Sequence, residues 1–370
     1  MKKIPLFDLN FGEEELAAVK EVLESKWISM GPKTLEFEKI YADLHHSKHA
    51  VAVTNCTAGL HLALRVCGVE AGDEVIVPSL TFVATANSVR MMGATPVFAD
   101  VVSLDDWTIC PKDIESKITS KTKAIIPMHF GGYGADMLKI CAIAKVHNLI
   151  VIEDACHAPL GKRDGQYLGT FGDMASYSFY SNKNMATGEG GMLLTQNEEF
   201  DKAARLLRAH GMTATAFDRE MGKEFYDVVD WGYNYRIDDI RSAIGVAQAK
   251  KLQEDVRKRK VLSDRYRENL SKVESVTVPF QNYPGESSNY VMGVLLESAD
   301  RKTVRRELNE LGIGSSMHYP PVHQFRCYKD FSAELPLTED IGSREISLPL
   351  YYNMEVEDVD YVCENFSKLI

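Results

Sequence analysis

Two patterns of hydrophobic and polar positions alternate along most of the chain. Short runs rich in Val and Ile, such as "EVIVPS", are followed by stretches with helical periodicity, such as "ADMLKICAIAKVHN". Apolar strands separated by helices are typical of a parallel sheet covered on both faces. We therefore expect an α/β fold around a mostly parallel sheet. The predicted strands are 50–55, 74–79, 95–101, 123–129, 149–155, 175–179 and 191–195.

Helical patterns lie before and between these strands. An amphipathic helix is predicted at 13–25, and Gly31 and Pro32 then interrupt the pattern as part of a loop. A second helical pattern follows at 33–44. The other helices of this part of the chain are expected at 57–68, 82–93 and 135–148.

The sequence changes character after residue 236. A long, charged helical pattern over 237–272 indicates one connecting helix or a pair of helices. Segments at 289–297 and 312–319 and helical patterns near 301–311 and 355–368 then suggest a small α+β domain. We therefore predict a large domain over 1–250, including the N-terminal segment. A connecting helix and a small C-terminal α+β domain are predicted over 251–370.

Composition and charge narrow the class of protein. The 370 residues are 45% hydrophobic, which is enough for a sizeable core. The net charge of −11 argues against sequence-independent binding of nucleic acid. The one dense basic run, 257–260, lies within the long helical pattern. We interpret it as a solvated helix face rather than a phosphate-binding patch.

The cysteines and the apolar runs indicate an intracellular protein. Seven cysteines are scattered without a CxxC pair, which is typical of reduced thiols in the cytosol. The apolar stretch near the N-terminus stops at Asp8, which is too short for a secretory signal. Because no run approaches the ~20 apolar residues of a membrane span, we expect a soluble, cytoplasmic protein.

Several motifs do not point to function. A GxGxxG after a strand and a GxxxxGK[ST] are both absent from the sequence, so neither a dinucleotide fingerprint nor a P-loop is indicated. The histidines of "HHSKH" (45–49) lack partners at metal-ligand spacing, so we expect a solvated turn and no metal site. We interpret "GGYG" (131–134) as a turn before a helix, with nearby side chains facing the site, and the alternative is a flexible active-site loop.

Candidate chemistry gathers where predicted strands end, at the sheet edge that binds ligands in doubly wound folds. In "TNCTAGLH" a strand gives way to a helix at Thr57, so the backbone N–H groups of Thr57 and Ala58 could seat a phosphate. The alternative is a simple Thr N-cap. Phe82 follows the next strand and is either a core residue or a ring stacked on a flat cofactor.

Two carboxylates lie at the end of the apolar strand in "VIEDACHAPLG". Glu153 and Asp154 are adjacent, so they should face opposite sides of the sheet. A carboxylate at a buried strand end needs a positive partner, and a pyridinium nitrogen would provide one. His157 follows three residues later, and its alternative interpretation is a hydrogen-bonded loop histidine.

A lysine follows in "SYSFYSNKNMATGEGG". Lys183 lies 29 residues after Asp154, and Ser178, five residues before it, could hold a phosphate. A lysine that forms a Schiff base must be partly desolvated, which lowers its pKa. Taken alone, Lys183 would be an ordinary loop lysine. Together the phosphate seat, the ring, the carboxylate and the lysine match the requirements of pyridoxal phosphate (PLP).

Several motifs occur in an order that resembles a known family. "EDACHAPLG", "GDMASYSFYSNKNMATGEGG", "GYNYRIDDIRSAIGVAQAKKL", "GIGSSMHYPPVH" and "SLPLYYNM" resemble the DegT/DnrJ/EryC1/StrS family of PLP-dependent nucleotide-sugar aminotransferases. The resemblance covers nearly the whole chain. It implies a type I aminotransferase fold with a mainly parallel seven-stranded sheet, and a homodimer with active sites at the interface.

The resemblance also implies roles for individual residues. Lys183 would be the Schiff-base lysine, and Asp154 the partner of the pyridine nitrogen. His157 would lie near the 3-oxygen of PLP, and Phe82 would stack on its ring. We interpret Gly188, Gly190 and Gly191 as the turn that returns the chain to the sheet and leaves room beside the cofactor.

The phosphate of PLP would be held by a second group of residues. Thr57, Ala58 and Ser178 match the family positions that bind it, and Asn234 matches the residue that reaches it from the neighbouring subunit. Cys56 departs from the family pattern, because relatives often carry Gly there. Cys is small, so we expect the phosphate seat to survive.

The family contains aminotransferases and dehydratases, and the dehydratases carry histidine where this chain has Lys183. The sequence therefore favours transamination from L-glutamate to a nucleotide-linked 3-keto or 4-keto sugar, with pyridoxamine phosphate (PMP) formed between the two half-reactions. The alternatives are a dehydratase, a transaminase of another ketone and a non-catalytic regulator. In "MHYPPVHQF", His318, Tyr319 and His323 are candidates for substrate contact or parts of a supporting loop.

Overall fold

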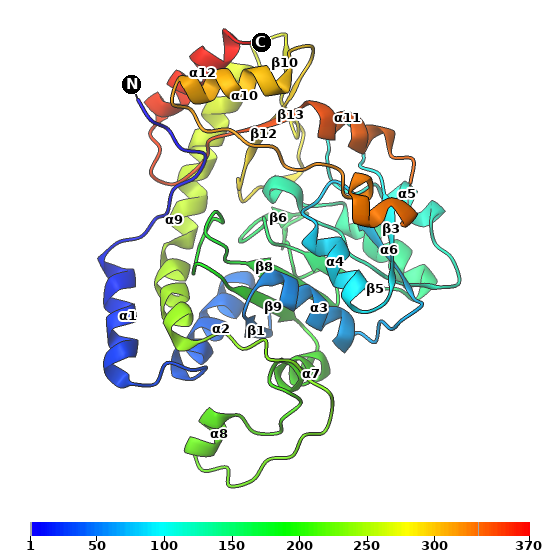
Figure 1. Cartoon of the computed structure of the whole chain (residues 1–370), viewed down its shortest axis with the longest axis vertical. Coiled ribbons are helices and arrows are strands. Elements are labelled where there is room, and N and C mark those ends of the chain that lie inside the picture. The colour runs from blue at the N-terminus through cyan, green and yellow to red at the C-terminus, as the bar shows by residue number, and fades with distance from the viewer. Residues whose placement is uncertain (1, 332) are drawn as a thin grey trace.

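The computed structural model describes residues 2–331 and 333–370, and a seven-stranded sheet forms its centre (Figure 1). The strand order is β1-β9-β8-β5-β4-β2-β3, and within this sheet β9 alone runs against the other strands. The prediction of a mainly parallel sheet is confirmed. The strands are β1 (His49–Val53), β2 (Glu74–Pro78), β3 (Thr95–Ala99), β4 (Thr122–Ile125), β5 (Ile150–Asp154), β8 (Met174–Ser178) and β9 (Gly191–Thr195).

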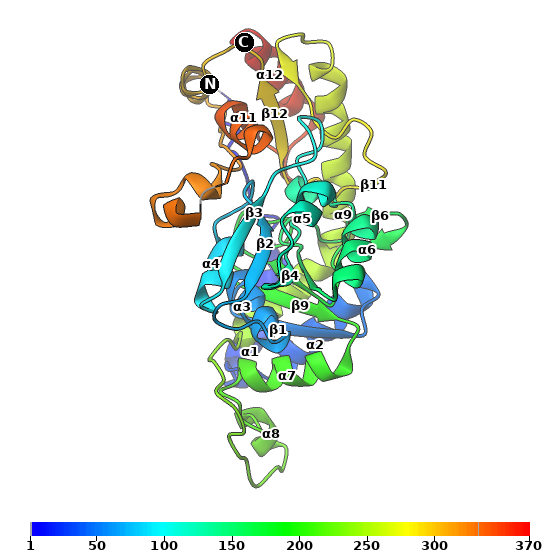
Figure 2. The same cartoon turned by 90° about the vertical axis from the view of Figure 1, so that its right-hand side faces the viewer.

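Helices cover both faces of this sheet. The helices of this part of the chain are α1 (Glu13–Ser25), α2 (Pro32–His45), α3 (Cys56–Val66), α4 (Ala84–Met91), α5 (Pro111–Ser116), α6 (Met137–His147), α7 (Glu198–Arg208), α8 (Ala216–Glu220) and α9 (Asp239–Leu270), of which α8 lies in a segment that projects away from the sheet. Side chains alternate along each strand, so Val51 of β1 packs with α3 and α7 while Ala52 packs with α2 and α9. Figure 2 shows α4 and α6 on opposite sides of the sheet.

The start of α2 differs from the prediction. The helix begins at Pro32 itself, after Gly31 in an extended conformation. Proline suits the first helical position because the N–H that it lacks would have no partner within the helix there. The expectation that Pro32 lies in a loop is therefore wrong.

The histidine cluster at 45–49 is also less exposed than predicted. His45 is fully buried at the end of α2 and stacks on Tyr41 with ring centroids 4.3 Å apart. Its Nε2 accepts a hydrogen bond from the backbone N–H of Leu160 at 3.0 Å, so its Nδ1 donates to the carbonyl of Tyr41 at 3.0 Å. Burial lowers the pKa of His45 to about 4. The prediction of a solvated turn is wrong for this residue, which is a neutral part of the core.

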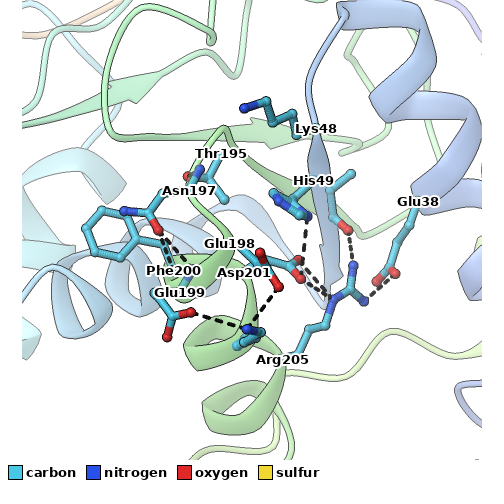
Figure 3. A network of polar contacts seen from close by, with 12 residues as sticks. Glu38, Lys48, His49, Thr195, Asn197, Glu198, Glu199, Phe200, Asp201 and Arg205 are labelled. Atoms are coloured by element: carbon cyan, nitrogen blue, oxygen red, sulfur yellow. Dashed lines mark hydrogen bonds and ion pairs between the residues drawn. The ribbon is translucent and has the colours of Figure 1, made fainter.

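A buried ion-pair network ties α2 to α7 and β1 (Figure 3). Glu38 of α2 accepts hydrogen bonds from Arg205 at 2.7 Å and Arg208 at 2.6 Å, both on α7, and from the backbone N–H of Ala52 at 2.9 Å. Burial raises the pKa of Glu38, but the two guanidinium groups outweigh burial, and the net pKa lies below its ordinary value. Asp201 also binds Arg205, so the network fixes α7 against the edge of the sheet.

The charged pattern at 237–272 forms one helix, α9, which runs from beside α2 to α12 (Figure 1). The expectation of a connecting helix is confirmed, and the alternative of a helix pair is wrong. The predicted boundary between residues 250 and 251 falls inside α9. The division into two domains stays a prediction.

The C-terminal part has the expected α+β character. A three-stranded antiparallel sheet, β10-β12-β13, shares an apolar core with α10 and α12. A second small sheet, β11-β6-β7, was not predicted. The elements are β6 (Lys162–Arg163), β7 (Gln166–Tyr167), β10 (Val276–Thr277), β11 (Gly285–Glu286), β12 (Met292–Leu296), β13 (Glu345–Leu348), α10 (Arg301–Glu310), α11 (Pro336–Arg344) and α12 (Val356–Ser367).

The basic run at 257–260 is mostly a solvated, ion-paired face of α9. Arg257 and Lys260 are exposed and pair with neighbouring carboxylates at 2.6 Å. Arg259 differs because it is buried, pairs with Asp255 at 2.7 Å and donates to the carbonyl of Leu350. The prediction of a solvated face is wrong for Arg259, which fastens α9 to the C-terminal part.

All seven cysteines lie within the described residues and are free. Of the helices in residues 2–331 and 333–370, none is long and apolar enough to cross a membrane.

Candidate active site

A cavity of about 470 Å³ lies at the carboxyl ends of the parallel strands, the edge where the sequence predicts a ligand site. Polar groups reach it from the ends of β5 and β8 and from the start of α3. Seven of the predicted site residues line this cavity: Thr57, Phe82, Asp154, Ser178, Lys183, His318 and Tyr319.

Asp154 ends β5 and points toward the cavity. Its Oδ2 accepts a hydrogen bond from Thr85 Oγ1 at 2.7 Å, and its Oδ1 accepts one from the backbone N–H of Cys156 at 3.3 Å. The side chain of Glu153 faces the other side and binds His129 at 2.8 Å, as the strand period predicts. The donors that hold Asp154 among the described residues are neutral. A cation in the cavity would therefore complete the pairing of this buried carboxylate.

Lys183 lies in the loop between β8 and β9. The residue is partly buried, and its Nζ lies 4.2 Å from the ring centroid of Tyr290. Burial lowers the pKa of Lys183, as expected, but the neighbouring side chains of Tyr290 and Cys156 raise it more. The net pKa lies above its ordinary value, so the predicted lowering is wrong.

The loop that carries Lys183 is fastened at several points. Asn184 donates to the carbonyl of Ser288 at 2.7 Å, and the backbone N–H of Ala186 binds Gln248 of α9 at 3.3 Å. Gly188 has a φ of +83°, which few other residues adopt without strain. These contacts hold the lysine over the cavity between two strands of the sheet.

His157 is buried behind the cavity wall. Its Nδ1 accepts a hydrogen bond from the backbone N–H of Gly131 at 3.3 Å, so the neutral ring carries its proton on Nε2. That proton is donated to the hydroxyl of Tyr319 at 3.0 Å. Burial and the nearby Lys183 lower the pKa of His157 well below its ordinary value. A neutral histidine therefore supports a tyrosine that lines the cavity.

The predicted phosphate seat lies at the start of α3. The helix begins at Cys56, one residue before the predicted start, and Asn55 is its N-cap. The alternative of Thr57 as N-cap is therefore wrong. The backbone N–H of Ala58 donates to Asn55 Oδ1 at 2.8 Å, so this predicted phosphate donor already has a partner in the structure. Thr57 and Ser178, the other predicted phosphate-binding residues of this chain segment and of β8, both line the cavity.

Three other candidates take distinct positions. Phe82 is 55% exposed and lines the cavity, so the alternative of a core residue is wrong. Asn234 is exposed beside Ala209 and is absent from the cavity lining. His323 binds Ser79 at 2.7 Å and Glu339 at 3.2 Å outside the cavity, which favours its interpretation as part of a supporting loop.

Thr85 and Tyr290 contact the candidate site residues Asp154 and Lys183, and neither was predicted. Thr85 lies three residues after Phe82, and this helical spacing could have indicated a side chain near the same site. Tyr290 precedes β12, and its position over Lys183 has no local sequence signal.

The combined donor set suits a phosphorylated, nitrogen-containing aromatic aldehyde. An amine at Lys183 and a carboxylate at Asp154 open onto one cavity. The positive end of α3 and the hydroxyl residues Thr57 and Ser178 border the same space. The residues present therefore fit PLP.

Comparison with known proteins gives the same result. The sequence model of the DegT/DnrJ/EryC1/StrS aminotransferase family matches residues 10–367. The chain belongs to this family. It is therefore a PLP-dependent sugar aminotransferase. The recognised family and the predicted fold, enzyme class and cofactor are confirmed.

Relatives of this aminotransferase match over nearly their whole length. The spore coat polysaccharide biosynthesis protein SpsC of Bacillus subtilis is 40% identical over 364 residues, covering 95% of this chain and 93% of that protein. GDP-perosamine synthase of Escherichia coli O157:H7 is 36% identical over 370 residues, covering 100% and 99%. The structure of Spr1654 from Streptococcus pneumoniae matches with a TM-score of 0.92 at 30% identity, covers 100% and 98%, and is known in PLP and PMP forms.

Proposed function

We propose that this aminotransferase moves the amino group of L-glutamate to a 3-keto or 4-keto group of a nucleotide-linked deoxysugar. The product would serve the biosynthesis of amino sugars for polysaccharide, lipopolysaccharide or natural-product glycosylation. The observation that carries the proposal is the placement of Asp154 and Lys183 in one cavity beside the N-terminus of α3. The names of SpsC and GDP-perosamine synthase support the sugar substrate.

The residues of the cavity would divide the work of holding PLP. Lys183 would hold the cofactor covalently, Asp154 would hold the ring nitrogen with its proton, and Thr57 and Ser178 would bind the phosphate. When bound, PLP supplies an electron-accepting ring that stabilises the negative charge left when a proton leaves the neighbouring carbon.

Proton transfer would fall to Lys183. Once the amino donor has displaced it, the Nζ atom would accept the proton from the carbon that carries the amino group and would donate it to a different carbon, the former aldehyde carbon of PLP. The same atom performs the reverse transfers when the keto-sugar binds. Because the donor product leaves before the sugar enters, ping-pong kinetics are expected.

A homodimer with shared active sites is part of the proposal. The segment around α8 projects from the body of the chain (Figures 1 and 2) and carries exposed apolar side chains, including Phe225 at 86% and Trp231 at 90% exposure. Contiguous exposed apolar surface is typical of a protein interface. Asn234 follows this segment, which supports its expected reach to the phosphate site of the neighbouring subunit.

The remaining proposals concern location and partners. Seven free cysteines support a cytoplasmic location, and the net charge of −11 supports the expectation that nucleic acid is not a partner.

The runner-up activities are a PLP-dependent dehydratase and transamination of another ketone. The family resemblance places histidine at the lysine position of dehydratases, so Lys183 favours transamination.

An assay with a panel of substrates tests the proposal. GDP-, UDP- and dTDP-linked 3-keto and 4-keto sugars are incubated with glutamate, and the formation of 2-oxoglutarate and amino sugar is measured by mass spectrometry. We expect equal amounts of both products for at least one sugar. Loss of water from a sugar without 2-oxoglutarate formation would indicate a dehydratase, and activity with simple ketones alone would indicate the other transaminase.

A further inference from the structure

A chain of buried polar side chains leads from β13 to the wall of the cavity. Glu345 is 1% exposed, Ser347 is fully buried, and the two residues share one face of the strand because they are two positions apart. Ser347 Oγ lies within hydrogen-bond distance of Glu345 Oε1 and 2.7 Å from His318 Nδ1. Glu345 Oε2 accepts a hydrogen bond from the backbone N–H of His318 at 2.7 Å. The carboxyl group therefore contacts the histidine both directly and through the serine.

The histidine at the end of this chain is neutral. Burial and the nearby Lys183 lower the pKa of His318 to about 3. Its ring lies edge-on to Tyr290, with centroids 6.1 Å apart, and to Tyr319, with centroids 4.8 Å apart. Because Ser347 occupies Nδ1, the Nε2 atom is the ring nitrogen left for a molecule in the cavity that His318 lines.

The direction of the hydrogen bonds depends on the proton of Glu345. When the carboxyl group is protonated, it donates to Ser347 Oγ, the serine hydroxyl donates to His318 Nδ1, and Nε2 carries the ring proton. When the carboxyl group is ionised, the serine donates to it and accepts from Nδ1–H. Nε2 then lacks a proton and can only accept.

We propose that Glu345 is a positioning residue that acts through Ser347 to keep the proton of His318 on Nε2, so that His318 donates a hydrogen bond to an oxygen atom of the sugar substrate. This inference rests on the proposed function for the identity of the substrate. It assigns His318 a binding role and gives Glu345 and Ser347 roles outside the cavity.

The surroundings of Glu345 favour its protonated form at neutral pH. Burial raises its pKa to about 8, although Ser347, the backbone N–H of His318 and the guanidinium groups of Arg301 and Arg305 lower it. The two arginines lie on α10. Arg301 binds the backbone carbonyl of Glu345 at 3.1 Å, and Arg305 donates to the carbonyl of Ser315. Tyr319 lies on the segment that precedes η2 (Val322–Gln324), and burial raises the pKa of its phenol, with a smaller contribution from the nearby carboxyl group of Glu345.

The proposal predicts a pH-dependent change in the histidine. Above pH 8 the carboxyl group ionises, His318 Nε2 loses its proton to Nδ1, and the hydrogen bond to the sugar is lost. For the sugar half-reaction, kcat/KM should then fall by about 2- to 13-fold in total and level off at higher pH, mainly through KM, because a single neutral hydrogen bond is lost. In Glu345→Gln the amide NH₂ group donates to Ser347 at every pH, so His318 should keep its proton on Nε2.

Nuclear magnetic resonance of the PLP-loaded protein tests the proposal without substrate. Ring ¹⁵N shifts of histidine-labelled wild type and Glu345→Gln are recorded from pH 6.5 to 9.5, with His318→Asn for assignment. We expect His318 to change from the Nε2–H to the Nδ1–H form near pH 8 in the wild type and to stay Nε2–H in Glu345→Gln. An unchanged tautomer in the wild type, or the same change in Glu345→Gln, would overturn the relay.

A second variant and a kinetic arm complete the test. Ser347→Ala breaks the chain, so its His318 tautomer should no longer follow pH, even if Glu345→Gln does not fold. In kinetics, Glu345→Gln should lack the alkaline rise of KM for the sugar. An alkaline rise of KM in that variant would overturn the hydrogen bond to the sugar. A normal tautomer change in a protein that aminates none of the sugars would refute the proposed function and leave the relay standing.

Discussion

Thr85 holds the carboxylate of Asp154, and removing its hydroxyl group should destabilise the protein measurably. Thr85 Oγ1 donates to Asp154 Oδ2 at 2.7 Å and accepts from Thr81 Oγ1 at 2.8 Å. Valine has nearly the same shape as threonine but no hydroxyl group. A buried hydrogen bond to a charged group contributes about 1.5–3 kcal/mol to stability. For a chain of 370 residues, this corresponds to a fall in Tm of about 2–4 °C.

A pair of variants isolates the bond to Asp154. Thr81→Val removes the neutral bond between the two threonines, and Thr81→Val/Thr85→Val removes the bond to Asp154 in addition. Calorimetry with excess PLP in every sample should show the double variant melting about 2–4 °C below Thr81→Val. Equal melting temperatures for these two variants would show that Thr85 does not stabilise the carboxylate.

Three further predictions concern chemistry, stability and assembly. Lys183→Ala should lose multiple turnover in the glutamate assay, and retained turnover would remove the lysine from the mechanism. Glu38→Gln should lose about 3–5 kcal/mol in urea denaturation, because Arg208 stays buried without its counter-charge. Because the folded state lowers the pKa of Glu38, the ion pairs of its carboxylate stabilise the fold at neutral pH, and this stabilisation is lost as the pH falls below the ordinary pKa of 4.5. The free energy of unfolding of Glu38→Gln should therefore change less between neutral and acid pH than that of the wild type. Phe225→Ser/Trp231→Ser should shift sedimentation toward monomer and reduce activity together, and an unchanged dimer would move the interface elsewhere.

The elements that could be predicted from the sequence are those with a clear pattern of hydrophobic and polar residues. Each of the seven strands of the large sheet was expected within two residues of its observed ends, except that the strand predicted at 123–129 extends past the end of β4 at Ile125. The two-residue strands β6, β7 and β11 are too short to show a period. The helix α7 did carry a signal, with Asn197 as N-cap and acidic residues in its first turn, and the prediction overlooked it.

The site was predictable where chemistry follows directly on a strand. Asp154 and Ser178 end parallel strands, so the topology alone brings them to one edge of the sheet. Tyr290 reaches Lys183 from a distant segment, and this contact depends on tertiary packing. The net rise in the pKa of Lys183 arises from such neighbours, which is why burial alone gave the wrong sign.

The point at which PLP is attached to the chain is the most direct test of the role proposed for Lys183. The PLP-loaded protein is reduced with borohydride, digested, and mapped by mass spectrometry, with Lys183→Ala treated in parallel. We expect one pyridoxyl group per chain on the peptide that contains Lys183 and none on the variant. A pyridoxyl group on another lysine, or unmodified wild-type protein after loading with PLP, would contradict this role.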